Sequence, residues 1–198
     1  HRTPVFQSQK FDNKAGASVI FKGEHLQKTG AFKARGAMNA VLINQEHAKG
    51  RGFVTHSSGN HGAALAWAAS NIGEKAHIIM PSNAPKAKIE AVRSYGGIIE
   101  FCAPTLDARE QTAKAVEEKE GAFFVHPYDN YDIIAGQATA TMEHWLIVLH
   151  ILLPREIVIL VLAVVQLREL VLPIKLQCKQ PPRHLPGIYG HIQQQILT

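Results

Sequence analysis

The stretch THSSGNHGAALAWAA, residues 55–69, reads as a strand end, a turn of small polar residues and then an apolar helix. Residues 57–61 would present backbone amides and hydroxyls at the helix N-terminus, where the helix dipole favours an anion. A simple helix cap is the alternative interpretation, because serine and asparagine are common caps. Five consecutive small or polar residues are more than a cap needs, and Gly59 indicates close approach of the backbone to a bound group. The stretch therefore predicts an anion site on a strand-to-helix turn.

Short β-branched or aromatic runs alternate with helical stretches before residue 142. Helices are predicted at 61–73, 84–97 and 105–121, with Thr105 as a candidate cap for the last. The alternation predicts an α/β fold with parallel βαβ units and ligands at the carboxyl ends of the strands. The predicted strands lie at 18–23, 52–58, 75–82, 96–102 and 121–127.

Composition excludes several classes of protein. The 198 residues are 46% apolar and 19% charged, which fits a globular protein. The net charge of +5 is modest and scattered, so no nucleic-acid partner is expected. Cys102 and Cys178 match no metal or redox spacing, which favours a reducing compartment such as the cytoplasm. No signal peptide opens the chain, and because it starts at His1 without a methionine, its true start is expected to be missing.

The pattern changes near residue 142. Thirteen of the fifteen glycines lie at or before Gly136, and no aspartate follows Asp132. Residues 145–165 are the most apolar part of the chain, but Pro154, Arg155 and Glu156 divide them into two runs of nine, each too short to span a bilayer as a helix. Buried segments are therefore expected rather than membrane spans. The apolar runs at 146–153 and 157–165 would suit strands, but the turn residues that should frame strands are absent, so the sequence predicts no definite element in this third of the chain.

A lysine stands out in QKTGAFKARGAMNAV, residues 27–41. Lys33 follows a compact Thr-Gly-Ala-Phe turn and opens an amphipathic helix. One interpretation is a solvated lysine at a helix start, and the other is a nucleophilic amine that the turn holds in place. An anion site some 25 residues later suits amine chemistry on an amino acid. The lysine would hold a carbonyl cofactor as an imine, and the amide loop would hold the substrate carboxylate.

Three motifs in this order, FKGEHLQKTGAFKARGAMNAV, THSSGNHG and HPYDNYDIIAGQAT, closely resemble the pyridoxal-phosphate threonine dehydratases and serine racemases of fold type II. The resemblance covers about residues 2–142, with Ala31 in place of the usual serine. It implies a tryptophan-synthase-β-like α/β fold with parallel sheets and helices on both faces. The implied parts are the start of a large domain (1–51), a small βαβ domain (52–132) and the return to the large domain with an unassigned tail (133–198).

The resemblance also implies roles for individual residues. Lys33 would form the Schiff base with pyridoxal phosphate and then act as a base at the substrate α-carbon. Phe32 would pack beside the cofactor ring, and Asn60 would hydrogen-bond its phenolic oxygen. Ser58 would face Lys33 across the cofactor plane and protonate the α-carbon from the other side. The substrate-binding residues implied are Ser57, Ser58, Gly59, Asn60, His61 and Gln137.

Threonine dehydration to 2-oxobutanoate and ammonia is the activity that the resemblance implies first. Serine racemisation is the alternative, because both reactions begin with removal of the α-proton. A catalytically inactive, truncated or frameshifted fragment is a further alternative, because no glycine run for the cofactor phosphate follows Met142. An amino-acid substrate and, for an intact chain, a homo-oligomer are expected. His126 and Asp129 lack a third ligand, so no metal site is expected, and Arg35 is expected either on a solvated face or paired with an acid.

Overall fold

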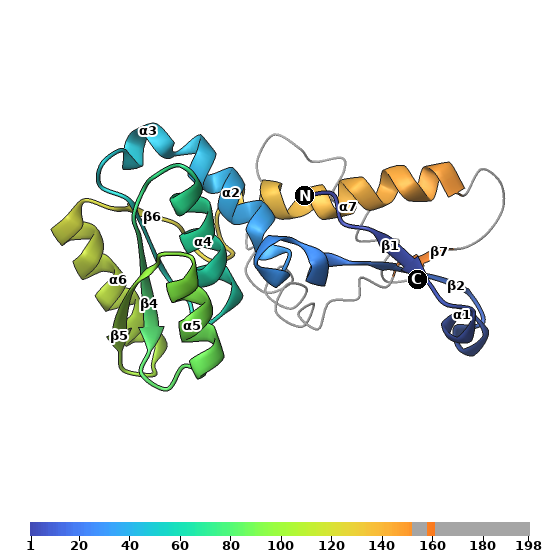
Figure 1. Cartoon of the computed structure of the whole chain (residues 1–198), viewed down its shortest axis with the longest axis horizontal. Coiled ribbons are helices and arrows are strands. Elements are labelled where there is room, and N and C mark those ends of the chain that lie inside the picture. Colours follow the sequence, from blue (N-terminus) through green and yellow to red (C-terminus); the bar gives the residue numbers. More distant parts are fainter. Residues whose placement is uncertain (152–157, 161–198) are drawn as a thin grey trace. The chain divides into compact units, whose positions relative to one another are not determined.

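The computed structural model describes residues 1–151 and 158–160, with side chains as far as His144. All of them belong to one compact unit, His1–Ala163. Their strands form two sheets, one with the order β5-β4-β3-β6 and one with the order β1-β2-β7 (Figure 1). The unassigned tail lies outside the described residues from residue 161 onward.

The four-stranded sheet is parallel throughout. All four residues of its central strand, β3, are buried, as is typical of a parallel strand that is covered on both faces. These strands confirm the predicted parallel α/β fold. The strands are β3 (Phe53–His56), β4 (Ala76–Pro81), β5 (Ile98–Cys102) and β6 (Phe123–Phe124).

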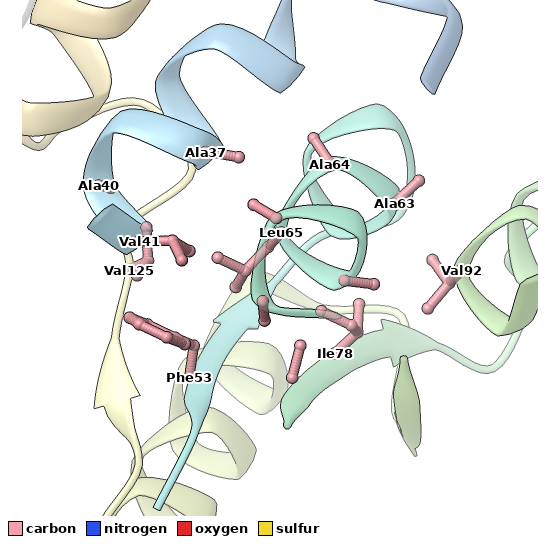
Figure 2. Close-up of a cluster of buried hydrophobic side chains, with 14 of the residues drawn as sticks. Ala37, Ala40, Val41, Phe53, Ala63, Ala64, Leu65, Ile78, Val92 and Val125 are labelled. Carbon is pink, nitrogen blue, oxygen red and sulfur yellow. The ribbon is translucent and has the colours of Figure 1, made fainter. Parts of the chain in front are cut away.

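Helices cover this sheet on both faces. Because successive side chains of a strand point to opposite faces, Phe53 and Ile78 pack with the alanines of α4, whereas Val54 and Ile79 pack on the α6 side. Figure 2 shows the first of these two clusters, with Leu65 of α4 close to the strands. The helices are α4 (Asn60–Asn71), α5 (Lys86–Ser94) and α6 (Leu106–Glu120).

Helix α6 begins and ends where the sequence predicts. The Thr105 hydroxyl accepts a hydrogen bond from the Ala108 N–H at 3.2 Å, which satisfies one of the amides left over at a helix start. Gly121 ends the helix with a φ of +66°, a left-handed conformation that glycine adopts at no steric cost. Both signals are local, so they could be predicted from the sequence.

The other sheet pairs β1 with β2 antiparallel and β2 with β7 parallel. Its strands are β1 (Val5–Gln7), β2 (Ser18–Lys22) and β7 (Val158–Leu160), with α1 (Gln9–Ala15) between the first two. Two short 3₁₀ turns, η1 (Glu24–Leu26) and η2 (Lys28–Gly30), follow β2 and lead to α2 (Lys33–Ile43) and α3 (Gln45–Ala48).

The unassigned apolar run at 146–153 is helical over its described part, because α7 (Tyr131–Ile151) continues through it. A nine-residue apolar run fits a buried strand and a buried helix equally well, and here the helix that starts at Tyr131 continues through it. β7 lies within the second apolar run, 157–165. Within the described residues, no helix is both long and apolar enough to cross a bilayer.

Helices α2 and α7 approach each other at two glycines. A Cβ atom on Gly136 would lie 2.5 Å from the Cα atom of Gly36 and 2.7 Å from the carbonyl oxygen of Arg35. Real Cβ atoms are not found so close to backbone atoms, so this contact requires glycine at position 136. Three other residues of α2, Ala37, Ala40 and Val41, join the core (Figure 2). The helix that carries Lys33 is therefore fixed by packing on two sides.

Candidate active site

The turn before α2 places Lys33 at the first helical position. Thr29 and Gly30 adopt left-handed conformations, with φ values of +62° and +70°. Threonine is rarely found in this region, and such a residue costs about 1 kcal/mol or more. The turn then buries Ala31 and Phe32 beneath the start of the helix. The structure thus combines a strained turn, a buried phenylalanine and the lysine in five consecutive residues.

The side chain of Lys33 is half-buried. Its Nζ atom donates to the carbonyl oxygen of Pro127 at 3.1 Å and lies 5.3 Å from the centre of the Phe32 ring. Pro127 belongs to the loop after β6, at the carboxyl end of that strand. His126 shapes this loop, because its Nδ1 atom accepts the Asp129 N–H at 2.7 Å. The amine therefore lies at the edge of the sheet where the βαβ pattern predicts ligands.

The loop between β3 and α4 has an open side. The Ser57 N–H donates to the Ile79 carbonyl at 2.9 Å, and the Ser57 hydroxyl accepts the Gly59 N–H at 3.2 Å. Ser58 is exposed. A Cβ atom on Gly59 would meet no described atom of the chain within 4 Å, and the φ of Gly59, −163°, is available to any residue. Packing within the described chain therefore gives no reason for glycine at this position.

His61 is buried in the first turn of α4. Neither of its ring nitrogens has a hydrogen-bond partner among the described residues. Burial, and then the positive charge of Lys33, lower the pKa of His61 to about 3. The backbone of Val125 acts in the opposite direction, but burial and the Lys33 charge outweigh it. The imidazole is therefore neutral at pH 7, and it lies within range of the Lys33 charge.

The structure brings most of the predicted site residues to the same edge of the sheet. Lys33 lies over the Phe32 ring, its charge acts on His61, and the loop 57–59 directly precedes α4 in the chain. Asn60 begins α4, and its Oδ1 atom accepts a hydrogen bond from Lys88 at 2.5 Å. Gln137 lies instead at the contact of α2 and α7, where its Oε1 atom accepts the Gly36 N–H at 3.2 Å. The roles assigned to these residues stay predictions.

A buried network of charges holds the start of α2 through Arg35. Arg35 donates to both carboxylate oxygens of Glu24 at 2.8 Å, and to those of Glu143 at 2.7 and 3.0 Å. Lys22, fully buried, donates to Glu143 at 2.7 Å and to the Thr3 hydroxyl at 2.6 Å. Of the two expectations for Arg35, pairing with an acid is therefore the correct one. The network itself was missed, since Arg35 and Glu143 are 108 residues apart and no local pattern connects them.

The network shifts the ionisation of its members. Burial alone would raise the pKa of Glu143, but hydrogen bonds from Arg35 and Lys22 lower it to about 2. Burial would likewise lower the pKa of Arg35, but its bonds to Glu24 and Glu143 raise it above its usual value. Arg35 and Glu143 are therefore both charged at neutral pH, and their ion pair holds the start of the helix two residues from Lys33.

A pocket of about 260 Å³ lies along the side of α2, and its lining includes Arg35, Asn39, Trp67 and Thr139. Neither Lys33 nor any residue of the loop 57–61 lines it, so it is separate from the candidate site. Among the residues that the structure describes, no three histidine, cysteine, aspartate or glutamate side chains come together as metal ligands would.

The side chains present fit one end of a carbonyl cofactor. Lys33 offers an amine for an aldehyde, and Asn60 keeps an amide NH₂ group to donate because its oxygen is occupied by Lys88. The α4 N-terminus and the polar, unpartnered His61 ring offer a place for a carboxylate. A phosphate cradle is not found in the sequence of this region, since no glycine lies between Gly136 and Gly187. The side chains present therefore suit the aldehyde end of the cofactor, and they do not provide for its phosphate.

The fold is a parallel α/β fold, and it places a half-buried lysine amine at the carboxyl edge of the sheet. A family model described as "pyridoxal-phosphate dependent enzyme" matches residues 1–162, and the chain belongs to this family. The cofactor of the family is pyridoxal phosphate. The match extends beyond residue 142, where the recognisable motifs end.

Similar proteins include both racemases and dehydratases. A β-hydroxyaspartate dehydratase of Paracoccus denitrificans is 44% identical over 142 residues, which are 72% of this chain and 45% of the relative. The structure of maize serine racemase matches with a TM-score of 0.74 and 44% identity, over 76% of this chain and 46% of the other. Threonine deaminase isoform 2 of Solanum lycopersicum, in its processed form, matches with a TM-score of 0.66 and 32% identity, over 73% and 40%. The chain spans less than half the length of the curated relatives it matches.

Proposed function

We propose that this chain carries the lysine half of a pyridoxal-phosphate enzyme that removes the α-proton of a small hydroxy amino acid. L-Threonine is the first candidate substrate, and 2-oxobutanoate and ammonia are the products. One observation supports the proposal best: the half-buried Lys33 amine is near enough to the buried His61 at the α4 N-terminus for its charge to help lower the His61 pKa and keep the ring neutral. An amine base and an anion site side by side suit an amino acid, whose α-carbon lies next to its carboxylate.

Each residue has a part in this proposal. Lys33 would hold the cofactor and then take the proton from the α-carbon. The amides of the loop 57–59 and the first turn of α4 would bind the carboxylate, and His61, being neutral, would accept or donate a hydrogen bond without adding charge. Asn60 would donate its NH₂ group to the phenolic oxygen of the cofactor. When bound, pyridoxal phosphate supplies an electron sink for the negative charge that develops at the α-carbon.

Racemisation is the second candidate, and it depends on Ser58. A hydroxyl on the face opposite Lys33 would return a proton to the other side of the α-carbon, and the exposed Ser58 side chain has access to solvent for the exchange of that proton. The relatives include enzymes named for each reaction, which supports both candidates. A chain that holds the cofactor without turnover is the third candidate, for which the missing glycine run is the reason.

One experiment separates the three candidates. The chain is incubated with pyridoxal phosphate and L-threonine or L-serine, and 2-oxo acid, ammonia and the enantiomers of the amino acid are measured together. Formation of 2-oxobutanoate supports the dehydratase, and formation of D-serine without 2-oxo acid supports the racemase. The Lys33→Ala variant should abolish either activity. If neither product forms although the cofactor becomes attached to Lys33, the proposal of turnover is wrong for this chain.

A further inference from the structure

Lys88 of α5 holds the side-chain oxygen of Asn60. Its Nζ atom donates to the Asn60 Oδ1 atom at 2.5 Å, across 28 residues of sequence. Lys88 is half-buried, whereas Lys86, on the first turn of the same helix, is exposed. The contact ties the start of α4 to α5 at the same edge of the sheet as Lys33.

This contact decides which end of the Asn60 amide is presented to a ligand. A carboxamide has an acceptor oxygen and a donor NH₂ group of nearly equal shape, so its orientation depends on its partners. An ammonium group only donates, and it can therefore bind the oxygen and not the NH₂ group. With the oxygen bound to Lys88, the NH₂ group remains for other partners, and within the described chain it has no hydrogen bond.

We propose that Lys88 is a positioning residue that makes Asn60 a fixed hydrogen-bond donor toward the cofactor. This inference rests on the proposed function, in which Asn60 contacts the phenolic oxygen of pyridoxal phosphate. The ammonium charge also polarises the amide, which makes its N–H groups better donors to an oxygen that carries negative charge. A rotated amide would present its own oxygen to the phenolic oxygen, and the two acceptors would repel each other. Lys88 thereby selects a ligand with an anionic acceptor at this position.

A purely structural role for Lys88 is the competing explanation. The apolar contacts of α5 with the core are made by Val92 and by Ile89 and Ala91, which do not depend on Lys88. A structural role would therefore show itself as a loss of stability, without any specific effect on the amide of Asn60 or on the cofactor.

The test compares Lys88→Met, Lys88→Arg and the matched control Lys86→Met with the unchanged chain. Without cofactor, NMR follows the side-chain NH₂ resonances of Asn60, which should shift in Lys88→Met only. With pyridoxal phosphate, the dissociation constant should rise about tenfold in Lys88→Met, the loss expected for a charge-assisted hydrogen bond. In the absorbance spectrum of the bound cofactor, the band at the longest wavelength should be weaker in Lys88→Met, relative to the band at shorter wavelength. In Lys88→Arg the Asn60 resonances, the dissociation constant and the absorbance spectrum should largely return to those of the unchanged chain. Lys86→Met should change none of the three.

Two results keep this inference separate from the proposed function. If the unchanged chain does not bind pyridoxal phosphate, the proposed function fails, and the NMR comparison alone decides the role of Lys88. If Lys88→Met leaves the Asn60 resonances and, where binding occurs, the dissociation constant and spectrum unchanged, the positioning role is overturned. If Lys88→Met does not fold, Lys88→Leu, which also has no donor for the Asn60 oxygen, is measured in its place, with the same expected shifts.

Discussion

The Nζ atom of Lys33 lies 3.1 Å from the carbonyl oxygen of Pro127, which comes 94 residues later in the chain. The contact joins the first residue of α2 to the loop after β6, so two separate elements determine where the amine lies. A backbone carbonyl positions the amine without adding a negative charge next to it. The loop that carries Pro127 is therefore next to the candidate site, and it opens the third of the three motifs on which the family resemblance rests.

Loss of the His126 ring should loosen this loop. In His126→Leu the Asp129 N–H loses its acceptor at 2.7 Å, and the carbonyl of Pro127 is then held less firmly against Lys33. We expect faster hydrogen exchange of the Asp129 amide and severalfold slower attachment of pyridoxal phosphate to Lys33. His47→Leu, a change of an exposed histidine on α3, is the control and should affect neither. Unchanged exchange and attachment in His126→Leu would show that the loop does not position the amine.

Two glycines should respond differently to replacement by alanine. Gly136→Ala introduces a Cβ atom 2.5 Å from the Gly36 Cα atom, so the backbones of α2 and α7 must move apart, at a cost of about 1–3 kcal/mol of unfolding free energy. Gly59→Ala meets no described atom and should leave stability unchanged. Its methyl group would instead reduce the binding of a carboxylate at the α4 N-terminus. Urea unfolding and titration with an amino acid measure the two effects, and equal stability of both variants would contradict the packing argument.

Removing Arg35 should destabilise the chain strongly. Its side chain is 7% exposed and is hydrogen-bonded to both Glu24 and Glu143. Arg35→Met leaves two carboxylates without this partner in a buried setting, which costs about 3–5 kcal/mol. The exposed pair of Lys119 and Glu120 provides the control, since Lys119→Met should leave the unfolding free energy unchanged. A small loss in Arg35→Met would mean that the network contributes little to holding α2.

The same network predicts a pH dependence of stability. The pKa of Glu143 is lowered from 4.5 to about 2, so between these values the unfolded chain binds more protons than the folded one. The stability that Glu143 contributes is therefore complete above pH 4.5 and is lost as the pH falls toward 2. The difference in unfolding free energy between the unchanged chain and Glu143→Gln should shrink over this window. A difference that stays constant with pH would contradict the assigned ion pairs.

The sequence predicts what is encoded locally. The cap at Thr105, the turn before α4 and the lysine at the start of α2 are short patterns with a direct structural meaning, and the structure has each of them at the predicted position. Helix α7 was missed because an apolar run without turn residues suits a strand and a helix equally. The contacts of Arg35 with Glu143 and of Lys88 with Asn60 could not be predicted, because they join residues that only the folded chain brings together.

Covalent trapping of the cofactor tests the central claim, that Lys33 is the amine that reacts with an aldehyde. The chain is incubated with pyridoxal phosphate, reduced with borohydride and digested, and the modified lysine is located by mass spectrometry. The account predicts modification of Lys33, its loss in Lys33→Ala, and unchanged labelling in Lys28→Ala, which removes an exposed lysine from the same turn. A chain that remains unlabelled, or that is labelled equally on several exposed lysines with Lys33 unmodified, would contradict it.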